Sequence, residues 1–210
     1  MIILFDLDGV ILDTESQYTR HWNSMGEKYL NQQNFGITIK GQTLVQILDR
    51  YVDDPQLAVI LEQAVDKFEN EMDYEFIPGA LEFMKMVKAA GIPSAIVTSS
   101  NEKKMSQIYK RYPDFKGLVN TILTAEHFTK SKPNPECFLK GMEVLGGTPE
   151  TTVVFEDSIH GLAAGRGSGA HVVGLTTTNS KEVLESLCDM PIDNFEGMTP
   201  QLLKERFGIN

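Results

Sequence analysis

Two aspartates that follow an apolar segment are the first residues in this chain whose types and spacing could do chemistry. The segment from Ile2 to Phe5 leads directly into Asp6, Leu7, Asp8 and Gly9. Two carboxylates this close repel each other and raise one another's pKa unless a cation lies between them. Gly9 permits the tight turn that lets both carboxylates point into one crevice. The pair therefore predicts a metal ion or a shared proton, and the plainer alternative is a helix N-cap.

Polar side chains of complementary kinds follow three later segments. The first is Thr98, Ser99 and Ser100, whose hydroxyls and backbone N–H groups, at an expected helix start, suit a phosphate. The second is Lys132, on a segment that prolines stiffen, and the third is the acidic pair Glu156 and Asp157, which suits Mg²⁺. Taken singly, each is an ordinary helix cap or surface residue. Taken together, they describe a phosphoryl-transfer site, with an acid to attack, a metal to neutralise charge, and hydroxyls and an ammonium to hold the phosphoryl oxygens.

Short apolar runs separated by amphipathic segments must position these groups. The runs, rich in β-branched residues, are Ile2 to Phe5, Ser94 to Val97, Val119 to Leu123, Thr152 to Phe155 and Val172 to Leu175. Such runs are typical of buried parallel strands, and their alternation with helical segments predicts an α/β fold with a doubly wound parallel sheet. In such sheets, ligands bind at the carboxyl ends of the strands.

One interval, residues 15–78, lacks strand-like runs and shows helical periodicity instead. We expect it to form an inserted all-helical cap domain, with residues 1–14 and 79–210 forming the core domain. Thr14 to Gln17 reads as a capping box, in which the Thr14 and Gln17 side chains satisfy each other's backbone donors at a helix start. The exit, Ile77-Pro78-Gly79, is a turn signal. Two short hinges predict a lid over the end of the first strand.

The motifs resemble those of the haloacid dehalogenase (HAD) superfamily, in its helical-cap branch of beta-phosphoglucomutase-like enzymes and small phosphatases. Asp6-Leu7-Asp8-Gly9-Val10 is similar to the first family motif, Thr98 to the second, Lys132 to the third, and Glu156-Asp157 to the fourth, which continues through Ser158 to Gly161. The resemblance covers nearly the whole chain and implies a Rossmann-like core.

The resemblance also implies the roles of the site residues. Asp6 would be the nucleophile that forms an aspartyl-phosphate, and Asp8 the acid and then the base, so that Asp8 must hold a proton near neutral pH. Thr98 and Lys132 would bind the transferring phosphoryl group, with Gly9, Ser99 and Ser100 beside it. Asp6, the Asp8 carbonyl and Asp157 would ligate Mg²⁺, assisted by Glu156. The expected activity is Mg²⁺-dependent hydrolysis of a small phosphorylated metabolite, such as a sugar phosphate.

The cap decides between hydrolysis and transfer to a second hydroxyl. Beta-phosphoglucomutases carry a histidine in the first cap helix and an arginine in the second cap segment, whereas this chain has Tyr18 and Leu44 there. Leucine cannot replace an arginine that binds a second phosphate. We therefore expect hydrolysis and keep the mutase reaction as the alternative. The cap residues expected to meet substrate are Tyr18, Trp22, Lys40 and Thr43, with packing inside the cap as an equal alternative for Trp22.

Three other classes of protein, namely signalling receiver domains, dinucleotide-binding enzymes and zinc proteins, account for fewer of these sequence features. A receiver-type signalling domain shares an acidic cluster, a hydroxyl and a lysine, but needs neither the insert nor the fourth motif. The run from Gly165 to Ala170 fits a relaxed dinucleotide fingerprint, but a helix precedes it and a strand follows it, the reverse of the required order. We expect these glycines to end a helix and turn into a strand. His21 and His160 lack zinc-site spacing.

Composition restricts the partners. The 210 residues include 19 Lys and Arg against 29 Asp and Glu, a net charge of −10, which disfavours nucleic-acid binding. We expect no membrane segment, no targeting peptide and no implied protein partner, hence a cytoplasmic protein. Cys137 and Cys188 are expected to be reduced, packed thiols.

Overall fold

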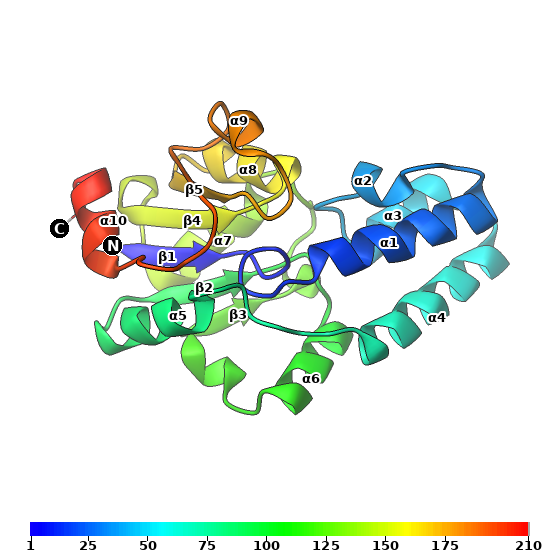
Figure 1. The fold of residues 1–210 in the computed structure, drawn as a ribbon, viewed down its shortest axis with the longest axis horizontal. Coiled ribbons are helices and arrows are strands. Elements are labelled where there is room, and N and C mark those ends of the chain that lie inside the picture. Colours follow the sequence, from blue (N-terminus) through cyan, green and yellow to red (C-terminus); the bar gives the residue numbers. More distant parts are fainter. Residues whose placement is uncertain (210) are drawn as a thin grey trace.

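A parallel β-sheet of six strands forms the centre of the structure, a computed structural model that describes residues 1–209 (Figure 1). The strands run in the order β3-β2-β1-β4-β5-β6 and every neighbouring pair is parallel. Their bounds are β1 (Ile2–Phe5), β2 (Ser94–Val97), β3 (Thr121–Leu123), β4 (Thr152–Glu156), β5 (His171–Leu175) and β6 (Met190–Ile192). The strand order reverses between β1 and β4, so the crevice at their carboxyl ends is the expected place for a ligand.

The two faces of the sheet are covered by different helices. Ile3 and Phe5 of β1 pack with α5 (Ala80–Ala89), α6 (Glu102–Arg111) and α10 (Pro200–Phe207). Ile2 and Leu4 point to the opposite face, because side chains alternate along a strand, and pack with α7 (Glu136–Leu145) and α8 (Ile159–Gly167). Short connecting elements are η2 (Phe115–Leu118), η3 (Ala125–His127), η4 (Pro149–Thr151) and α9 (Lys181–Leu184). The predicted doubly wound α/β fold is confirmed.

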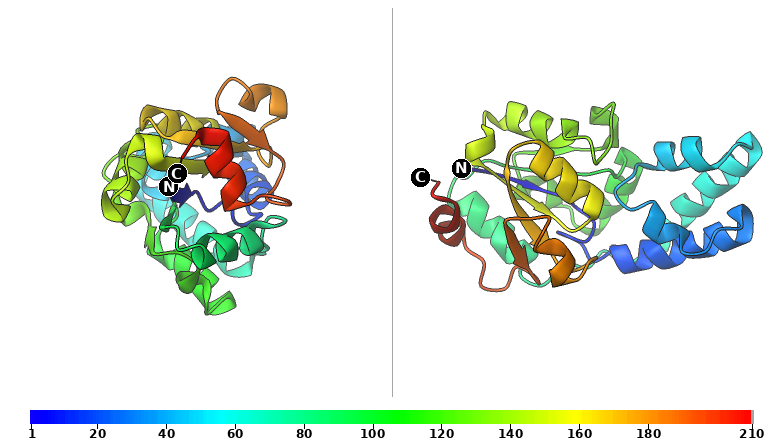
Figure 2. Two further views of the ribbon diagram at one scale, coloured as in Figure 1. Left: turned by 90° about the vertical axis from the view of Figure 1, so that its left-hand side faces the viewer. Right: turned by 90° about the horizontal axis from the view of Figure 1, so that it is seen from above.

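A helical insert follows β1 and ends before α5. It contains α1 (Glu15–Met25), the π-helical turn η1 (Gly26–Leu30), α2 (Phe35–Thr38), α3 (Leu44–Tyr51) and α4 (Pro55–Glu71). The insert has its own apolar cluster, built around Trp22, Phe35, Ile39, Ile47 and Val65. It projects beyond the carboxyl ends of the strands (Figures 1 and 2). The insert therefore faces the edge of the sheet that carries the polar motifs.

The capping box predicted at Thr14 to Gln17 is wrong. Thr14 is the residue before α1, but its hydroxyl donates to Asp8 Oδ1 instead of capping the helix. The Gln17 side chain bonds to the backbone of Asp73, accepting from its N–H at 3.0 Å and donating to its carbonyl at 3.0 Å. Partners distant in the sequence thus replace the local pairing that the motif predicts.

The remaining differences concern the edges of the sheet. Strand β6 was missed, because three half-buried residues with Pro191 in the middle resemble an edge strand or a loop. Strand β3 begins at Thr121 rather than Val119. The Gly165 to Ala170 run does end helix α8 and turn into β5, as expected.

Both cysteines are buried free thiols, as predicted. Within residues 1–209, none of the helices combines the length and the apolar character that crossing a bilayer requires.

Candidate functional site

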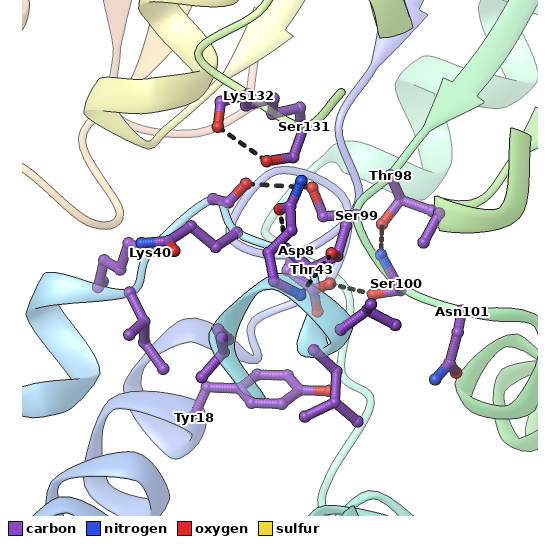
Figure 3. Close-up of a pocket in the computed structure, with 18 of the residues that line it drawn as sticks. Asp8, Tyr18, Lys40, Thr43, Thr98, Ser99, Ser100, Asn101, Ser131 and Lys132 are labelled. Carbon is purple, nitrogen blue, oxygen red and sulfur yellow. Dashed lines mark hydrogen bonds between the residues drawn. The ribbon is translucent and has the colours of Figure 1, made fainter. Parts of the chain in front are cut away.

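A cavity of about 600 Å³ lies between the strand ends and the helical insert, and the candidate residues from both parts line it, with the exception of Gly9 and Glu156. The core contributes the loops after β1, β2 and β4 and the segment that leads into α7. The insert contributes α1, α3 and the segment between α2 and α3. Figure 3 shows Asp8, the residues from Thr98 to Asn101, and Lys132 on the core side, facing Tyr18, Lys40 and Thr43 of the insert. The structure therefore brings the sequence motifs to one place.

Lys132 joins the first and the last acidic motif. Its ammonium lies 2.5 Å from Asp6 Oδ1 and 2.5 Å from Glu156 Oε1, and all three side chains are buried. The other Glu156 oxygen accepts hydrogen bonds from the backbone N–H groups of Asp157 and Ser158, at 2.9 and 3.0 Å. A buried charge is stable only when it is paired and hydrogen-bonded, and this network meets that condition for Lys132 and Glu156.

Three buried carboxylates form a group that can hold a metal ion. Single oxygens of Asp6, Glu156 and Asp157 lie within 4.8 Å of one another. Burial raises the pKa of Asp6 to about 8, with Lys132 opposing and the neighbouring Glu156 and Asp8 adding to the rise. Burial and the charges of Glu15, Glu156 and Asp6 also raise the pKa of Asp157 well above its usual value. A divalent cation would relieve this repulsion, and hard carboxylate oxygens are donors that suit Mg²⁺.

The residues after β5 hold Asp157 in place. The Thr178 hydroxyl donates to Asp157 Oδ2, and the Asn179 side-chain amide donates to the Asp157 carbonyl at 2.8 Å. The neighbouring Thr177 hydroxyl donates to the Gly9 carbonyl at 2.6 Å. This loop therefore supports both sides of the acidic cluster, since Gly9 belongs to the first motif and Asp157 to the fourth.

Gly9 makes the approach of the two acidic motifs possible. Its φ of +76° lies in the left-handed region, as the tight turn after β1 predicts. A Cβ at this position would lie 2.2 Å from Asp157 Oδ2. A larger residue would therefore push the first and fourth motifs apart.

Asp8 is held as a carboxylate, which corrects the expectation that it holds a proton near neutral pH. Thr14 and Lys104 donate to its Oδ1 and Ser100 donates to its Oδ2, the last two at 2.5 and 2.8 Å. Burial alone would raise the pKa of Asp8, but the Lys104 ammonium and the three donors outweigh it and the pKa is lowered. The form seen here is ready to accept a proton.

The hydroxyl cluster after β2 lies in the cavity but not at a helix start. The Thr98 hydroxyl accepts from the Ser100 N–H at 3.0 Å, and Ser99 donates to the Gly41 carbonyl of the insert at 3.3 Å. Helix α6 begins only at Glu102, and Asn101 caps it. The cluster thus offers hydroxyl groups, while at the start of α6 the Lys104 N–H is engaged by the Asn101 cap and the Glu102 N–H by Glu126.

The insert residues chosen from the sequence all line the cavity, but each also has a structural partner. Tyr18 donates its hydroxyl to Glu69 at 2.7 Å, and Lys40 forms a 3.0 Å ion pair with Glu15. Trp22 is buried in the insert's apolar cluster, and Thr43 forms a capping box at the start of α3 with Gln46. Both interpretations of Trp22 are therefore compatible with its position.

Sequence reasoning missed several residues of the site. They are Thr14, Glu69, Lys104, Thr178 and Asn179, which bond to the candidate residues as described above. One signal was available for Lys104, because it lies four residues before Ile108 and therefore on the buried face of α6. His160, which lacks zinc-site spacing in the sequence, donates from Nδ1 to the Lys40 carbonyl at 2.7 Å and so connects core and insert.

Comparisons with known proteins agree with the motifs. The family model of haloacid dehalogenase-like hydrolases matches residues 3–175. The chain is 29% identical over 212 residues to a beta-phosphoglucomutase of Mycobacterium bovis, covering 83% of this chain and 80% of that protein. It is 28% identical over 204 residues to hexitol phosphatase A of Escherichia coli, covering 93% and 92%.

The fold is also shared with solved structures. The crystal structure of a HAD hydrolase of family IA, variant 3, from Entamoeba histolytica superposes with a TM-score of 0.81 at 21% identity, covering 99% of each chain. With the family model matching most of its length, the chain belongs to the haloacid dehalogenase-like hydrolases.

Proposed function

We propose that this protein is a Mg²⁺-dependent phosphatase that hydrolyses a small phosphomonoester, with a sugar or polyol phosphate as the substrate class. The observation that carries the proposal is the placement of Asp6 and Asp8 at one cavity, with Lys132 bonded to Asp6. The names of two relatives, a hexitol phosphatase and a beta-phosphoglucomutase, support the substrate class.

In the first half of the proposed reaction, an Asp6 carboxylate oxygen attacks phosphorus and the bond from phosphorus to the leaving oxygen breaks. Asp8, whose contacts in the structure favour the carboxylate, must take up a proton before this half; it gives that proton to the leaving oxygen, and the leaving group departs as an alcohol. Lys132 and the Thr98 hydroxyl hold the oxygens of the transferring group. The product of this half is a phosphate ester on Asp6.

In the second half, a water oxygen bonds to phosphorus and the bond from phosphorus to the Asp6 oxygen breaks. The water proton passes to Asp8, which is then ready to act as the acid in the next turnover. Mg²⁺ bound by Asp6, Asp157 and the Asp8 carbonyl, with Glu156 assisting, would neutralise negative charge on the phosphoryl group.

Residues 15–78 act as the cap domain in this proposal, and residues 1–14 and 79–210 as the core domain. Three contacts hold the cap against the core: Ser99 to the Gly41 carbonyl, His160 to the Lys40 carbonyl, and the ion pair of Lys103 with Asp66. A cap closed in this way excludes bulk water from the transferring group.

The mutase reaction is the alternative, and the charges in the cavity favour hydrolysis. Among the described residues that line it there is no arginine, and each of its three lysines already has an acidic partner, Glu15, Asp8 or Asp6. A mutase must also bind a second phosphate group, for which a free guanidinium is the usual partner. Tyr18 and Leu44 supply no such charge.

The test is Mg²⁺-dependent phosphate release from a panel of sugar phosphates, polyol phosphates, nucleotides and pyrophosphate. Release over many turnovers that is lost in Asp6→Asn and kept in Asp13→Asn supports the proposal, because Asp13 is an exposed acid of the same loop. A coupled assay follows conversion of beta-glucose 1-phosphate to glucose 6-phosphate. Isomer formation without phosphate release would replace the phosphatase by the mutase.

A further inference from the structure

Lys104 is a buried cation that neither the sequence motifs nor the proposed reaction uses. It lies on α6, its side chain is 2% exposed, and its ammonium is 2.5 Å from Asp8 Oδ1. Its backbone is fixed, because the Lys104 N–H donates to the N-cap Asn101 at 2.9 Å and the adjacent Met105 is buried in the core. A lysine is rarely buried this deeply unless its charge has a partner, and here the partner is Asp8.

The contact with Lys104 completes a set of donors that fixes the direction of the Asp8 carboxylate. Oδ1 accepts from both Lys104 and Thr14, whereas Oδ2 accepts only from Ser100. Because these donors come from the loop after β1, the loop after β2 and helix α6, rotation of the carboxylate would break bonds to three segments. Oδ2 therefore has more free capacity than Oδ1 to accept a hydrogen bond from a group in the cavity.

The cap covers Lys104 from the other side. The Lys104 ammonium lies 4.4 Å from the centroid of the Tyr18 ring, within the range of a cation–π contact. The Tyr18 hydroxyl in turn donates to Glu69 on α4. Lys104 is therefore enclosed between Asp8 of the core and the Tyr18 ring of the cap.

We propose that Lys104 is a positioning residue that holds the Asp8 carboxylate, in the closed form, toward the water that attacks the phosphate ester on Asp6. The inference rests on the proposed function and concerns its second half, in which Asp8 accepts the water proton. Thr14 and Ser100 can hold Asp8 in either protonation form, whereas the ammonium of Lys104 bonds much more strongly to the ionised form than to the neutral acid. Lys104 therefore acts on the step in which Asp8 starts as a carboxylate.

The test separates the two halves of the reaction with p-nitrophenyl phosphate and saturating Mg²⁺ in a stopped-flow instrument. p-Nitrophenolate leaves without a proton, so its first release does not depend on Asp8, whereas hydrolysis of the ester on Asp6 does. In Lys104→Met we expect a burst of about one p-nitrophenolate per site, followed by a steady-state rate about 10- to 100-fold below that of the original protein. KM for the ester is expected to fall together with kcat, because slowing only the second step leaves kcat/KM unchanged.

The matched control is Lys103→Met, which removes a neighbouring cation of α6 that pairs with Asp66 of the cap. The Lys103 side chain is 60% exposed and bonds to Asp66, not to Asp8. Because an ion pair of an exposed lysine contributes little to stability, we expect this variant to lose clearly less of the steady-state rate than Lys104→Met and to show no new imbalance between the two phases. Loss of the same size in Lys103→Met would assign the effect to cap closure in general and overturn the inference.

Two further results would overturn the inference. The first is a Lys104→Met steady-state rate equal to that of the original protein. The second is a burst and a steady state that slow by the same factor, so that the ratio of the two rates does not change. If Lys104→Met does not fold, Tyr18→Leu tests the same arrangement by removing the ring over Lys104, and the second phase should again slow more than the first. If the unaltered protein releases neither p-nitrophenolate nor phosphate from any ester of the panel above, the proposed function fails, and the inference fails with it.

Discussion

The Lys132 ammonium lies 2.5 Å from Asp6 Oδ1, and this ion pair joins two motifs that are 126 residues apart in the chain. Lys132 makes a second bond of the same length to Glu156, so one cation serves two buried carboxylates. The pair therefore has two consequences, one for stability and one for turnover.

Lys132→Met is expected to lose both stability and turnover. Removing the ammonium leaves Asp6 and Glu156 buried without their cation, and breaking such a pair costs about 3–5 kcal/mol of unfolding free energy. Urea unfolding followed by circular dichroism measures the loss, and phosphate release measures the activity. Lys130→Met, in which an exposed lysine of the same segment is changed, should match the original protein in both assays.

The pH dependence of the metal-free protein should reveal the raised pKa of Asp6. A carboxyl whose pKa rises from 3.8 unfolded to about 8 folded binds more protons when folded. Its contribution to stability is therefore present below pH 4 and is lost as pH rises toward 8. We expect the unfolding free energy of the original protein to fall relative to that of Asp6→Asn between pH 5 and pH 8 in EDTA, as measured by urea titration. Equal pH slopes for the two proteins would contradict the raised pKa.

Mg²⁺ binding should become stronger as pH rises, because the ion binds the ionised carboxylates. Protons compete with the metal at Asp6 and Asp157, both of which have raised pKa values. Mg²⁺ affinity, measured by isothermal titration calorimetry, is therefore expected to increase from pH 6 to pH 8, with protons released on binding. Binding that is independent of pH across this range would count against these two ligands.

Thr178→Val is expected to weaken Mg²⁺ binding about 10-fold, because the Thr178 hydroxyl orients Asp157 and loss of such a partner typically costs 10- to 100-fold in affinity. Calorimetry on the folded variant measures this directly. Thr176→Val is the control, since the Thr176 hydroxyl bonds to Asp193 and not to the acidic cluster. Unchanged affinity in Thr178→Val would show that Asp157 does not depend on this bond.

The sequence predicted the core of the site because topology gathers it. Asp6, Thr98 and Glu156 follow or end three neighbouring parallel strands, and the carboxyl ends of such strands meet at one edge of the sheet. The type of each residue then indicates the chemistry. Hence the acids, hydroxyls and lysine singled out from spacing line one cavity, except Glu156, which lies beside it and bonds to Lys132.

The residues that were missed depend on side-chain directions that spacing does not give. Lys104 bonds to Asp8 from the first turn of α6, and Thr178 bonds to Asp157 from a loop 21 residues later in the chain. Thr14 shows the same limit, because its hydroxyl has two possible partners, a local N–H and the distant Asp8 carboxylate. The charged acceptor forms the stronger bond, and the local capping motif is not used.

Gly9→Ala tests whether the close approach of the first and fourth motifs is required. Alanine at a φ of +76° costs about 1 kcal/mol for the left-handed backbone alone. Its Cβ would in addition lie 2.2 Å from Asp157 Oδ2, so Asp157 must move.

Gly91→Ala is a matched control, because Gly91 has a φ of +65° with nothing within 4 Å of the added Cβ. We expect urea unfolding to show a greater loss of stability in Gly9→Ala than in Gly91→Ala, and calorimetry to show weaker Mg²⁺ binding in Gly9→Ala only. Equal losses in the two variants, with Mg²⁺ affinity kept, would mean that the loop after β1 can shift without disturbing Asp157.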